Sequence, residues 1–267
     1  MLIDIHCHVL NGIDDGAKDM DAALAMCRIA AEDGTDGIIA TPHYIHGSIN
    51  NTRDIVQQKV VDLNSCLKEQ NININIYPGC EAFICPELPQ LVREGHVCTL
   101  NNTKYILIEL PMASMPEYTI DVIYKLKLDG YTPIIAHPER NAVIGKDPNI
   151  LIDLISRGAL SQANTTSIRG LFGKDIMETS VTLLKHNMVH FIASDAHTVG
   201  GRSPKLSSAM SIIENKVGNE TLQNIIKNNR AVLNGESIEI EEPIMITGLN
   251  GLNFFGNFMK KVSGILK

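Results

Sequence analysis

Six short apolar runs in this sequence each lead to a histidine, an aspartate or a glutamate. Each run contains isoleucine and is bounded by polar residues, which is typical of a buried strand. The first run starts at Leu2 and the last at Val189. The polar residues at or just past the run ends, with one aspartate in the loop after the first run, are His6, His8, Asp15, His43, Glu81, Glu109, His137, Asp195 and His197. The pattern predicts a site for several metal ions, assembled where strands end.

The spacing within the first and last runs assigns side chains to faces. Successive side chains of a strand point to opposite sides, so His6 and His8 should share one face, with Ile3, Ile5 and Cys7 on the other. By the same alternation Asp195 and His197 share a face. The first and the last run therefore each offer a pair of ligands to a cation.

Helical patterns separate the apolar runs, which predicts about seven β/α units. The expected helices are Asp19–Asp33, Thr52–Gln70, Pro86–Glu94, Thr119–Asp129, Asn149–Arg157 and Asp175–Asn187, and a further strand is expected at Ala159–Asn164. Repeated alternation favours parallel strands with right-handed crossovers, and in closed α/β barrels the chemistry lies at the carboxyl ends of the strands. With 267 residues the chain suits a single α/β barrel domain.

Composition narrows the partners and the compartment. The net charge of -7 argues against an extended basic surface, so no nucleic-acid partner is expected. The six cysteines are scattered and no secretory signal is evident, which favours a reducing cytoplasm. Cys80 and Cys85 do not form a CxxC pair, and Cys7 should point away from the histidines, so neither structural zinc nor a cysteine nucleophile is expected. No stretch has the ~20 apolar residues that a membrane span requires.

The ligand types indicate the metal and its use. Imidazole and carboxylate without thiolate suit manganese, iron or zinc better than an oxygen-liganded magnesium or calcium site. Divalent ions roughly 3.5–4 Å apart can share a hydroxide, polarise a phosphoryl group and stabilise the leaving oxygen. This chemistry predicts phosphate ester hydrolysis without a covalent intermediate.

The order of these residues resembles the PHP superfamily, named for polymerase and histidinol phosphatase domains. Finer motifs resemble the manganese-dependent tyrosine-protein phosphatases of bacterial capsule and exopolysaccharide loci; they are Ile13–Gly16 (IDDG), Ala40–Tyr44 (ATPHY), Pro78–Glu81 (PGCE), Glu109–Pro111 (ELP), Ala136–Asn141 (AHPERN) and Ala193–His197 (ASDAH). The resemblance runs from Leu2 to about Pro243. Asn11 departs from it, because many members have proline there.

The resemblance implies a distorted (β/α)7 barrel with up to three divalent ions, Mn²⁺ foremost. It assigns one ion to His6, His8, Glu81 and Asp195, a second to Glu81, Glu109 and His137, and a third to Asp15, His43 and His197. It also implies that Arg140 and Arg202 bind the phosphate, a role that suits the planar guanidinium fork. The implied substrate is phosphotyrosine on a bacterial tyrosine kinase that controls polysaccharide export. A phenolate leaves with a pKa near ~10, so strong general-acid help is less necessary.

Alternatives stay open beside this interpretation. A small-molecule phosphatase of the histidinol-phosphate type would share the metal site. A nuclease is disfavoured by the acidic charge and by the lack of a basic or aromatic track. A metal-stabilised regulatory partner of the kinase would bind without turnover. Among the other histidines, His46 is a candidate for the site mouth, whereas His96, His186 and His190 are expected to be structural or solvent-exposed.

The chain divides into an expected catalytic unit, 1–243, and a tail, 244–267. The tail carries Leu249, Leu252, Phe254, Phe255, Phe258 and Met259 ahead of Lys260 and Lys261. Such an amphipathic segment can pack on its own barrel, on a second subunit of an oligomer, or on the inner membrane surface. Packing on protein is the favoured interpretation.

Overall fold

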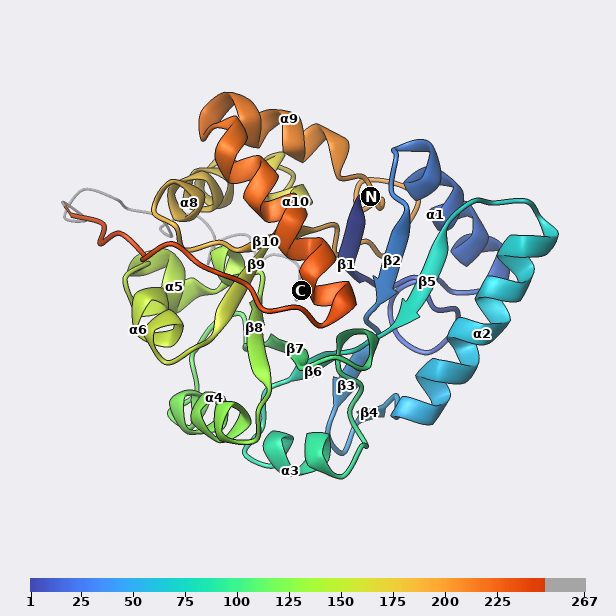
Figure 1. Cartoon of the computed structure of the whole chain (residues 1–267), viewed down its shortest axis with the longest axis horizontal. Coiled ribbons are helices and arrows are strands. Elements are labelled where there is room, and N and C mark those ends of the chain that lie inside the picture. Colours follow the sequence, from blue (N-terminus) through green and yellow to red (C-terminus); the bar gives the residue numbers. More distant parts are fainter. Residues whose placement is uncertain (248–267) are drawn as a thin grey trace, which may run out of the picture.

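The structure is a computed structural model and describes residues 1–247 (Figure 1). Strands and helices alternate along most of the chain, and two short 3₁₀ helices are labelled η. In chain order the elements are β1 (Ile3–Cys7), α1 (Met20–Glu32), β2 (Gly37–Ala40), β3 (His43–Ile45), β4 (Ile49–Asn50), α2 (Arg53–Glu69), β5 (Asn75–Pro78), β6 (Glu81–Phe83), α3 (Leu88–Arg93), η1 (Leu100–Asn102), β7 (Tyr105–Glu109), α4 (Thr119–Leu128), β8 (Thr132–Ala136), η2 (Pro138–Arg140), α5 (Ala142–Lys146), α6 (Ile150–Ser156), β9 (Leu160–Asn164), α7 (Thr165–Ile168), α8 (Lys174–Lys185), β10 (Phe191–Ala193), α9 (Ser207–Lys216) and α10 (Asn219–Asn234).

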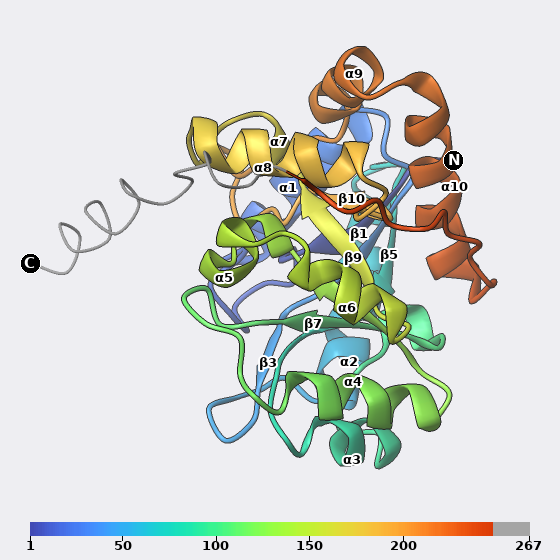
Figure 2. The same ribbon diagram turned by 90° about the vertical axis from the view of Figure 1, so that its left-hand side faces the viewer.

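The strands form two sheets rather than the single closed barrel that the sequence predicts. One sheet has the order β1-β2-β5, and the other has the order β10-β9-β8-β7-β6-β3-β4. All pairings are parallel except the one between β3 and β4. Helices α1 and α2 lie beside the three-stranded sheet, and α3 to α8 surround the other (Figures 1 and 2).

The division into two sheets arises where the predicted runs at 37–43 and 74–81 each break into two strands. Pro42 lies at the first break and has no N–H to donate to a ladder, while its carbonyl accepts from the Glu81 amide at 3.1 Å. Pro78 and Gly79 lie at the second break. At the other edge, β1 meets the chain after β10 through an isolated bridge between Cys7 and Ala196. The strands therefore lack one continuous, closed ladder.

A bulge in β1 changes the predicted facing of its side chains. The register against β2 shifts by one residue between Asp4 and Cys7. Ile3 and Ile5 consequently pack in the same inner cluster as Leu107 and Phe191, not on the face opposite the histidines as strict alternation predicts. Bulges commonly re-aim side chains beside active sites. Here the bulge allows an inner apolar layer and the two histidines above it to come from one strand.

Helix α10, which the sequence analysis left unassigned, covers β1 and β10 (Figure 1). Val232 and Leu233 of this helix complete the inner apolar cluster. The buried Asn229 donates from Nδ2 to the carbonyls of Ile3 and Ile192, each at 2.8 Å. The helix therefore fixes β1, which contains His6 and leads to His8, and β10, which leads to Asp195 and His197.

The tail begins on the surface of the described domain. The Ile244 amide donates to the His186 carbonyl at 2.9 Å, and the Ile246 amide donates to Asn149 Oδ1 at the same distance. The apolar residues predicted from Leu249 onward, and the two lysines after them, lie outside the described residues. Within residues 1–247, none of the helices combines the length and apolar character needed to cross a bilayer.

Candidate metal centre

Strand ends and the loops beside them bring all nine predicted ligand residues into one cluster. His6 lies in β1 and His8 just after it, Asp15 follows in the next loop, and His43 and Glu81 begin β3 and β6 as register partners. Glu109 ends β7 and His137 directly follows β8, while Asp195 and His197 follow β10. His137 and Asp195 have left-handed backbone conformations, with φ of 34° and 49°. Such strain in residues other than glycine is typical of functional sites.

His6, His8 and Glu81 form a buried group whose donor atoms all lie within 4.8 Å of one another, and Asp195 approaches its two histidines. His6 Nε2 and His8 Nε2 lie 3.3 Å apart, and each lies 3.3 Å from Glu81 Oε2. Each nitrogen also lies 3.5 Å from Asp195 Oδ1. Ligand atoms at about 2.1 Å from a tetrahedral ion would be about 3.4 Å from one another. The distances among His6, His8 and Glu81, and those from Asp195 to the two imidazoles, are close to this spacing.

Glu81 also reaches a second group through its other oxygen. His137 Nε2 lies 2.9 Å from Glu81 Oε1 and 3.8 Å from Glu109 Oε1. Glu81 Oε2 faces His6 and His8, so the two oxygens of one carboxylate serve different neighbours. This geometry matches the bridging position that the resemblance implies for Glu81.

The third group forms around Asp15. Its Oδ1 lies 3.2 Å from His197 Nε2 and 3.5 Å from His43 Nε2. The His8 ring stacks on the His197 ring with centroids 3.9 Å apart, which brings His8 to this group as well. His43 also turns its Nδ1 toward Glu81 Oε2, at 3.2 Å, so this imidazole lies between two of the groups. The buried Nδ1 has no hydrogen-bond partner among the described residues.

Three polar residues that the sequence analysis missed hold the ligands in place. His8 Nδ1 lies 2.7 Å from Asp14 Oδ2, and His6 Nδ1 lies 2.8 Å from Gln162 Oε1. Asn164 donates from Nδ2 to Asp195 Oδ2 at 2.6 Å. A hydrogen bond at Nδ1 fixes the imidazole tautomer and leaves the Nε2 lone pair free for a metal. The adjacent aspartates of the IDDG motif and the alternation of Gln162 and Asn164 in β9 were the available sequence signals.

Burial and neighbouring charges shift the pKa values within the cluster. Burial raises the pKa of Glu81, but the charge of His6 and the hydrogen bond from His137 outweigh it and hold this pKa well below its usual value. Burial, followed by the charge of Glu81, raises the pKa of Glu109 to about 7. Burial lowers the pKa of His8, but its hydrogen bonds to Asp14 and Glu81 outweigh that effect. The pKa values of Glu81 and Glu109 are thus shifted in opposite directions, and strongly shifted pKa values are typical of functional sites.

The two predicted phosphate-binding arginines lie at the edge of the cluster. Arg140 Nη1 and Arg202 Nη2 donate to the same Asp195 oxygen, Oδ2, at 3.0 and 2.9 Å. Their side chains are 20% and 30% exposed, whereas Asp195 is buried. Each guanidinium therefore connects the buried ligands with the surface, where a phosphate can reach it.

The remaining candidates lie apart from this chemistry. Cys7 is buried, its Sγ lies 3.8 Å from the Ala196 carbonyl, and burial holds its thiol pKa well above the usual value. His46 is exposed in the turn after β3, and His96 is 55% exposed. His186 Nδ1 lies 2.7 Å from the Thr182 carbonyl. The Cys7 thiol is thus protonated and unsuited to nucleophilic attack, in agreement with the sequence-based expectation.

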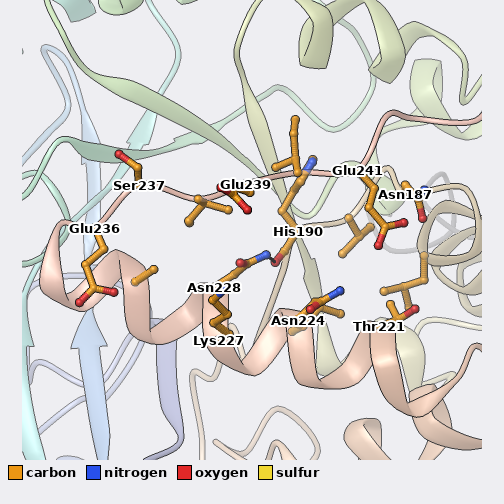
Figure 3. Close-up of a pocket in the computed structure, with 16 residues that line it drawn as sticks. Asn187, His190, Thr221, Asn224, Lys227, Asn228, Glu236, Ser237, Glu239 and Glu241 are labelled. Carbon is orange, nitrogen blue, oxygen red and sulfur yellow. Dashed lines mark hydrogen bonds between the residues drawn. The ribbon is translucent and has the colours of Figure 1, made fainter.

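A pocket of about 550 Å³ opens away from the ligands, between α10 and the chain that follows it (Figure 3). None of the nine ligand residues lines this pocket. His190 does, and its Nδ1 accepts a hydrogen bond from the Ser161 amide at 3.1 Å. Burial lowers the pKa of His190 to about 4, so the ring is neutral at pH 7. These contacts agree with the structural role expected for this histidine.

Comparison with known proteins places this site in a family. Residues 2–234 match the family model described as "Capsular polysaccharide synthesis, CpsB/CapC". Tyrosine-protein phosphatase YwqE of Bacillus subtilis (strain 168) is 37% identical over 254 residues, which cover 95% of this chain and 100% of that protein. Tyrosine-protein phosphatase CpsB of Streptococcus agalactiae is 27% identical over 243 residues, covering 89% of this chain and 100% of that protein.

Comparison with solved structures supports the same family and shows a wider likeness of fold. A chain from the crystal structures of YwqE from Bacillus subtilis and CpsB from Streptococcus pneumoniae, described as "unique metal-dependent tyrosine phosphatases", aligns with a TM-score of 0.90 and 38% identity, covering 92% of this chain and 100% of that one. A lactonase from Listeria monocytogenes aligns with a TM-score of 0.57 and 14% identity over 87% of this chain and 94% of its own, a likeness of fold alone. Because the family match spans nearly all of the described residues and YwqE is similar over its whole length, this chain belongs to the CpsB/CapC family of capsular polysaccharide synthesis proteins.

Proposed function

We propose that this protein is a metal-dependent protein-tyrosine phosphatase that acts on a phosphorylated bacterial tyrosine kinase. The observation that carries the proposal is the cluster of nine His, Asp and Glu side chains with two arginines at its exposed edge. The relatives YwqE and CpsB, which bear the name tyrosine-protein phosphatase, support the reaction. We also propose that the two sheets of residues 1–243 together represent a distorted, incompletely closed (β/α)7 barrel, with 244–267 as a tail.

The donor set fits up to three divalent ions, with Mn²⁺ proposed as the resident metal and iron or zinc as substitutes. His6, His8, Glu81 and Asp195 would hold one ion, and the 3.3 and 3.5 Å spacings of their donor atoms support this assignment. Glu81, Glu109 and His137 would hold a second, and Asp15, His43 and His197 a third. Bound ions supply Lewis acidity that polarises the phosphoryl group and makes water a stronger nucleophile at neutral pH.

Side chains around the cluster would orient the metal ligands and stabilise the charge of the phosphate. Asp14 and Gln162 hold the rings of His8 and His6 with Nε2 facing the cluster. The forks of Arg140 and Arg202 would receive two phosphate oxygens and stabilise the charge that shifts during in-line displacement. A phenolate needs little protonation to leave, because the pKa of a phenol is about 10. No cysteine nucleophile is needed, which agrees with the buried, protonated Cys7 thiol.

The proposed setting is the cytoplasm, where the kinase domain of such a partner would present its phosphotyrosines. All six cysteines are free, which suits a reducing compartment. Regulation of capsular or exopolysaccharide synthesis follows from the family to which the chain belongs. This part of the proposal rests on the family and on the named relatives.

The test measures initial rates on three substrates with chelated protein reloaded with Mn, Fe, Zn or Mg. The substrates are a phosphotyrosine peptide, a phosphoserine peptide of the same sequence, and histidinol phosphate. Metal content is determined on each sample, so that loss of metal and loss of turnover are separated. Metal-dependent preference for phosphotyrosine is the expected result.

Matched variants sharpen the test. His6→Ala and His8→Ala should lose bound metal and turnover, whereas His96→Ala, at an exposed histidine, should keep both. Faster turnover of histidinol phosphate would retain the metal site and overturn the substrate. Turnover of phosphotyrosine that is unaffected by chelation would overturn the metal mechanism.

A further inference from the structure

We propose that Leu171, Phe172 and Val199 form an apolar wall beside the two arginines that receives the aromatic ring of the substrate's phosphotyrosine. This inference rests on the proposed phosphatase function and specifies how the site selects a phenolic ester. Together these three residues form the aryl wall.

Phe172 lies against one of the arginines. The Arg140 Cζ is 4.6 Å from the centroid of the Phe172 ring, within the range of a cation–π contact. The ring is partly buried and Arg140 is 20% exposed, so both reach the surface together. An aromatic ring that supports the phosphate-binding guanidinium is also within reach of a group esterified to that phosphate.

Leu171 lies beside the loop that carries the other arginine. Its Cδ1 and Cδ2 are each 3.7 Å from the position that a Cβ on Gly201 would occupy, and Gly201 immediately precedes Arg202. Leu171 is 48% exposed, and Val199, in the same loop as Gly201, is 51% exposed. Leu171 is therefore open to solvent beside the loop that carries Arg202, and the exposed Val199 lies three residues before that arginine.

The backbone holds the aryl wall in place. The Gly173 amide donates to the Gly170 carbonyl at 3.0 Å, which makes Leu171 and Phe172 the central residues of a tight turn. The Leu171 amide is tied to the Thr166 carbonyl, also at 3.0 Å. On the facing loop, the His197 amide donates to the Arg202 carbonyl at 3.0 Å, so Val199 lies near the loop tip. Turn centres usually carry polar residues or glycine, so apolar residues at a fixed turn suggest a binding role.

The chemistry of the wall favours an aryl ester over an alkyl ester. Aromatic pairs prefer centroid separations of about 4.5–7 Å, and a phenyl ring bonded through oxygen to a phosphate on Arg140 would lie close to Phe172. A phosphoserine has only one methylene group between its phosphate and its backbone, so it would not cover the aryl wall, whose apolar side chains would stay exposed to solvent. The wall therefore adds affinity selectively for phosphotyrosine.

The experiment measures two ligands on metal-loaded protein by calorimetry: phenylphosphonate, and inorganic phosphate as the probe without a ring. Leu171→Ser and Phe172→Ala should each weaken phenylphosphonate binding about fivefold to tenfold. Leu171→Ser should change phosphate binding less than about twofold. Phe172→Ala also removes the ring beside Arg140, so it should weaken phosphate binding, but less than it weakens phenylphosphonate binding. Phe172→Tyr, which keeps the ring, should retain the wild-type ratio of the two affinities. Leu128→Ala removes an apolar side chain that is 68% exposed on α4 and serves as the control.

Rates on the phosphotyrosine peptide complete the test. Leu171→Ser leaves the Arg140–Phe172 contact intact, so its expected effect is a higher KM at nearly unchanged kcat. Equal weakening of both ligands would show that the wall only supports the arginines, and no weakening would show that it does not touch the ring; either result overturns the inference. If wild-type protein binds phenylphosphonate in preference to phosphate but does not hydrolyse the peptide, the proposed function fails while the wall stands.

Discussion

Asp14→Asn should weaken metal binding although Asp14 lies outside the predicted ligand set. The carboxylate is fully buried and lies 2.7 Å from His8 Nδ1. Its oxygens also accept from the amides of Gly16 and His43, at 2.9 and 3.1 Å. Asparagine keeps an oxygen for the imidazole but loses the negative charge that makes His8 a stronger donor. Replacement of such a partner typically reduces metal affinity or activity by ~10–100-fold.

The effect on folding should be smaller than the effect on metal binding. A hydrogen bond to a charged group contributes about 1.5–3 kcal/mol and a neutral one about 0.5–1.5 kcal/mol, so Asp14→Asn should cost about 1 kcal/mol of unfolding free energy. Asp14→Ala should cost several kcal/mol, because it leaves buried N–H groups of three residues without an acceptor.

The assay is competition for Mn²⁺ against a chelator of known affinity, with urea unfolding of the metal-free protein alongside. Asp19→Asn is the matched control, because Asp19 caps α1 at an exposed position and asparagine is an equally good cap. The reasoning is refuted if Asp14→Asn binds Mn²⁺ within twofold of wild type, or if all of its loss is explained by a fraction of unfolded protein.

Other consequences follow from buried groups and from the arginine fork. Asn229→Ala should lower the unfolding free energy by about 2–4 kcal/mol in urea titration, because it removes a hydrogen bond to each of two strand carbonyls in the core. Burial lowers the pKa of His190 to about 4 in the folded protein, whereas a histidine in the unfolded chain has a pKa near ~6.5. As the pH falls below ~6.5 the unfolded chain therefore binds the proton first, and the unfolding free energy should decline by about 2 kcal/mol at pH 5. His190→Gln should lose less unfolding free energy over the same pH interval. Arg140→Lys replaces a planar fork by a point charge and should lower kcat/KM for a phosphotyrosine peptide by ~10–100-fold in steady-state assays, with bound metal unchanged.

The sequence was most informative where polarity interrupts an apolar run. Glu109 and His137 lie within one residue of their predicted strand ends because a buried strand tolerates such side chains only at its edge. The helices predicted at 19–33 and 52–70 are found at Met20–Glu32 and Arg53–Glu69, since their apolar stripes face the core. These features depend on local periodicity, which one sequence records.

Features that depend on distant neighbours were not predictable in this way. The bulge in β1 is visible only in its register against β2, and the break at Pro42 matters because Glu81 pairs with its carbonyl. Gln162 supports His6 across 156 positions of sequence. Helix α10 differs from these features, because Leu222, Ile225 and Val232 have helical spacing that is visible in the sequence itself. Its function of covering β1 and β10 requires the fold.

Metal binding should stabilise the whole fold, because the cluster joins strands from both sheets. Five imidazoles and four carboxylates lie together here, and ions that bind only the folded chain shift unfolding by mass action. At Mn²⁺ concentrations near 100 times the dissociation constant, the gain is about 2.7 kcal/mol, or about 5–10 °C in Tm for a domain of this size. Differential scanning fluorimetry across a Mn²⁺ series would measure it. His6→Ala lacks a ligand of one of the three proposed ions, so its Tm should rise less than that of the wild type, whereas His96→Ala should respond fully. A Tm independent of Mn²⁺ in the wild type, or an equal rise in His6→Ala, would mean that the ions bind elsewhere and that the cluster is held by its own hydrogen bonds alone.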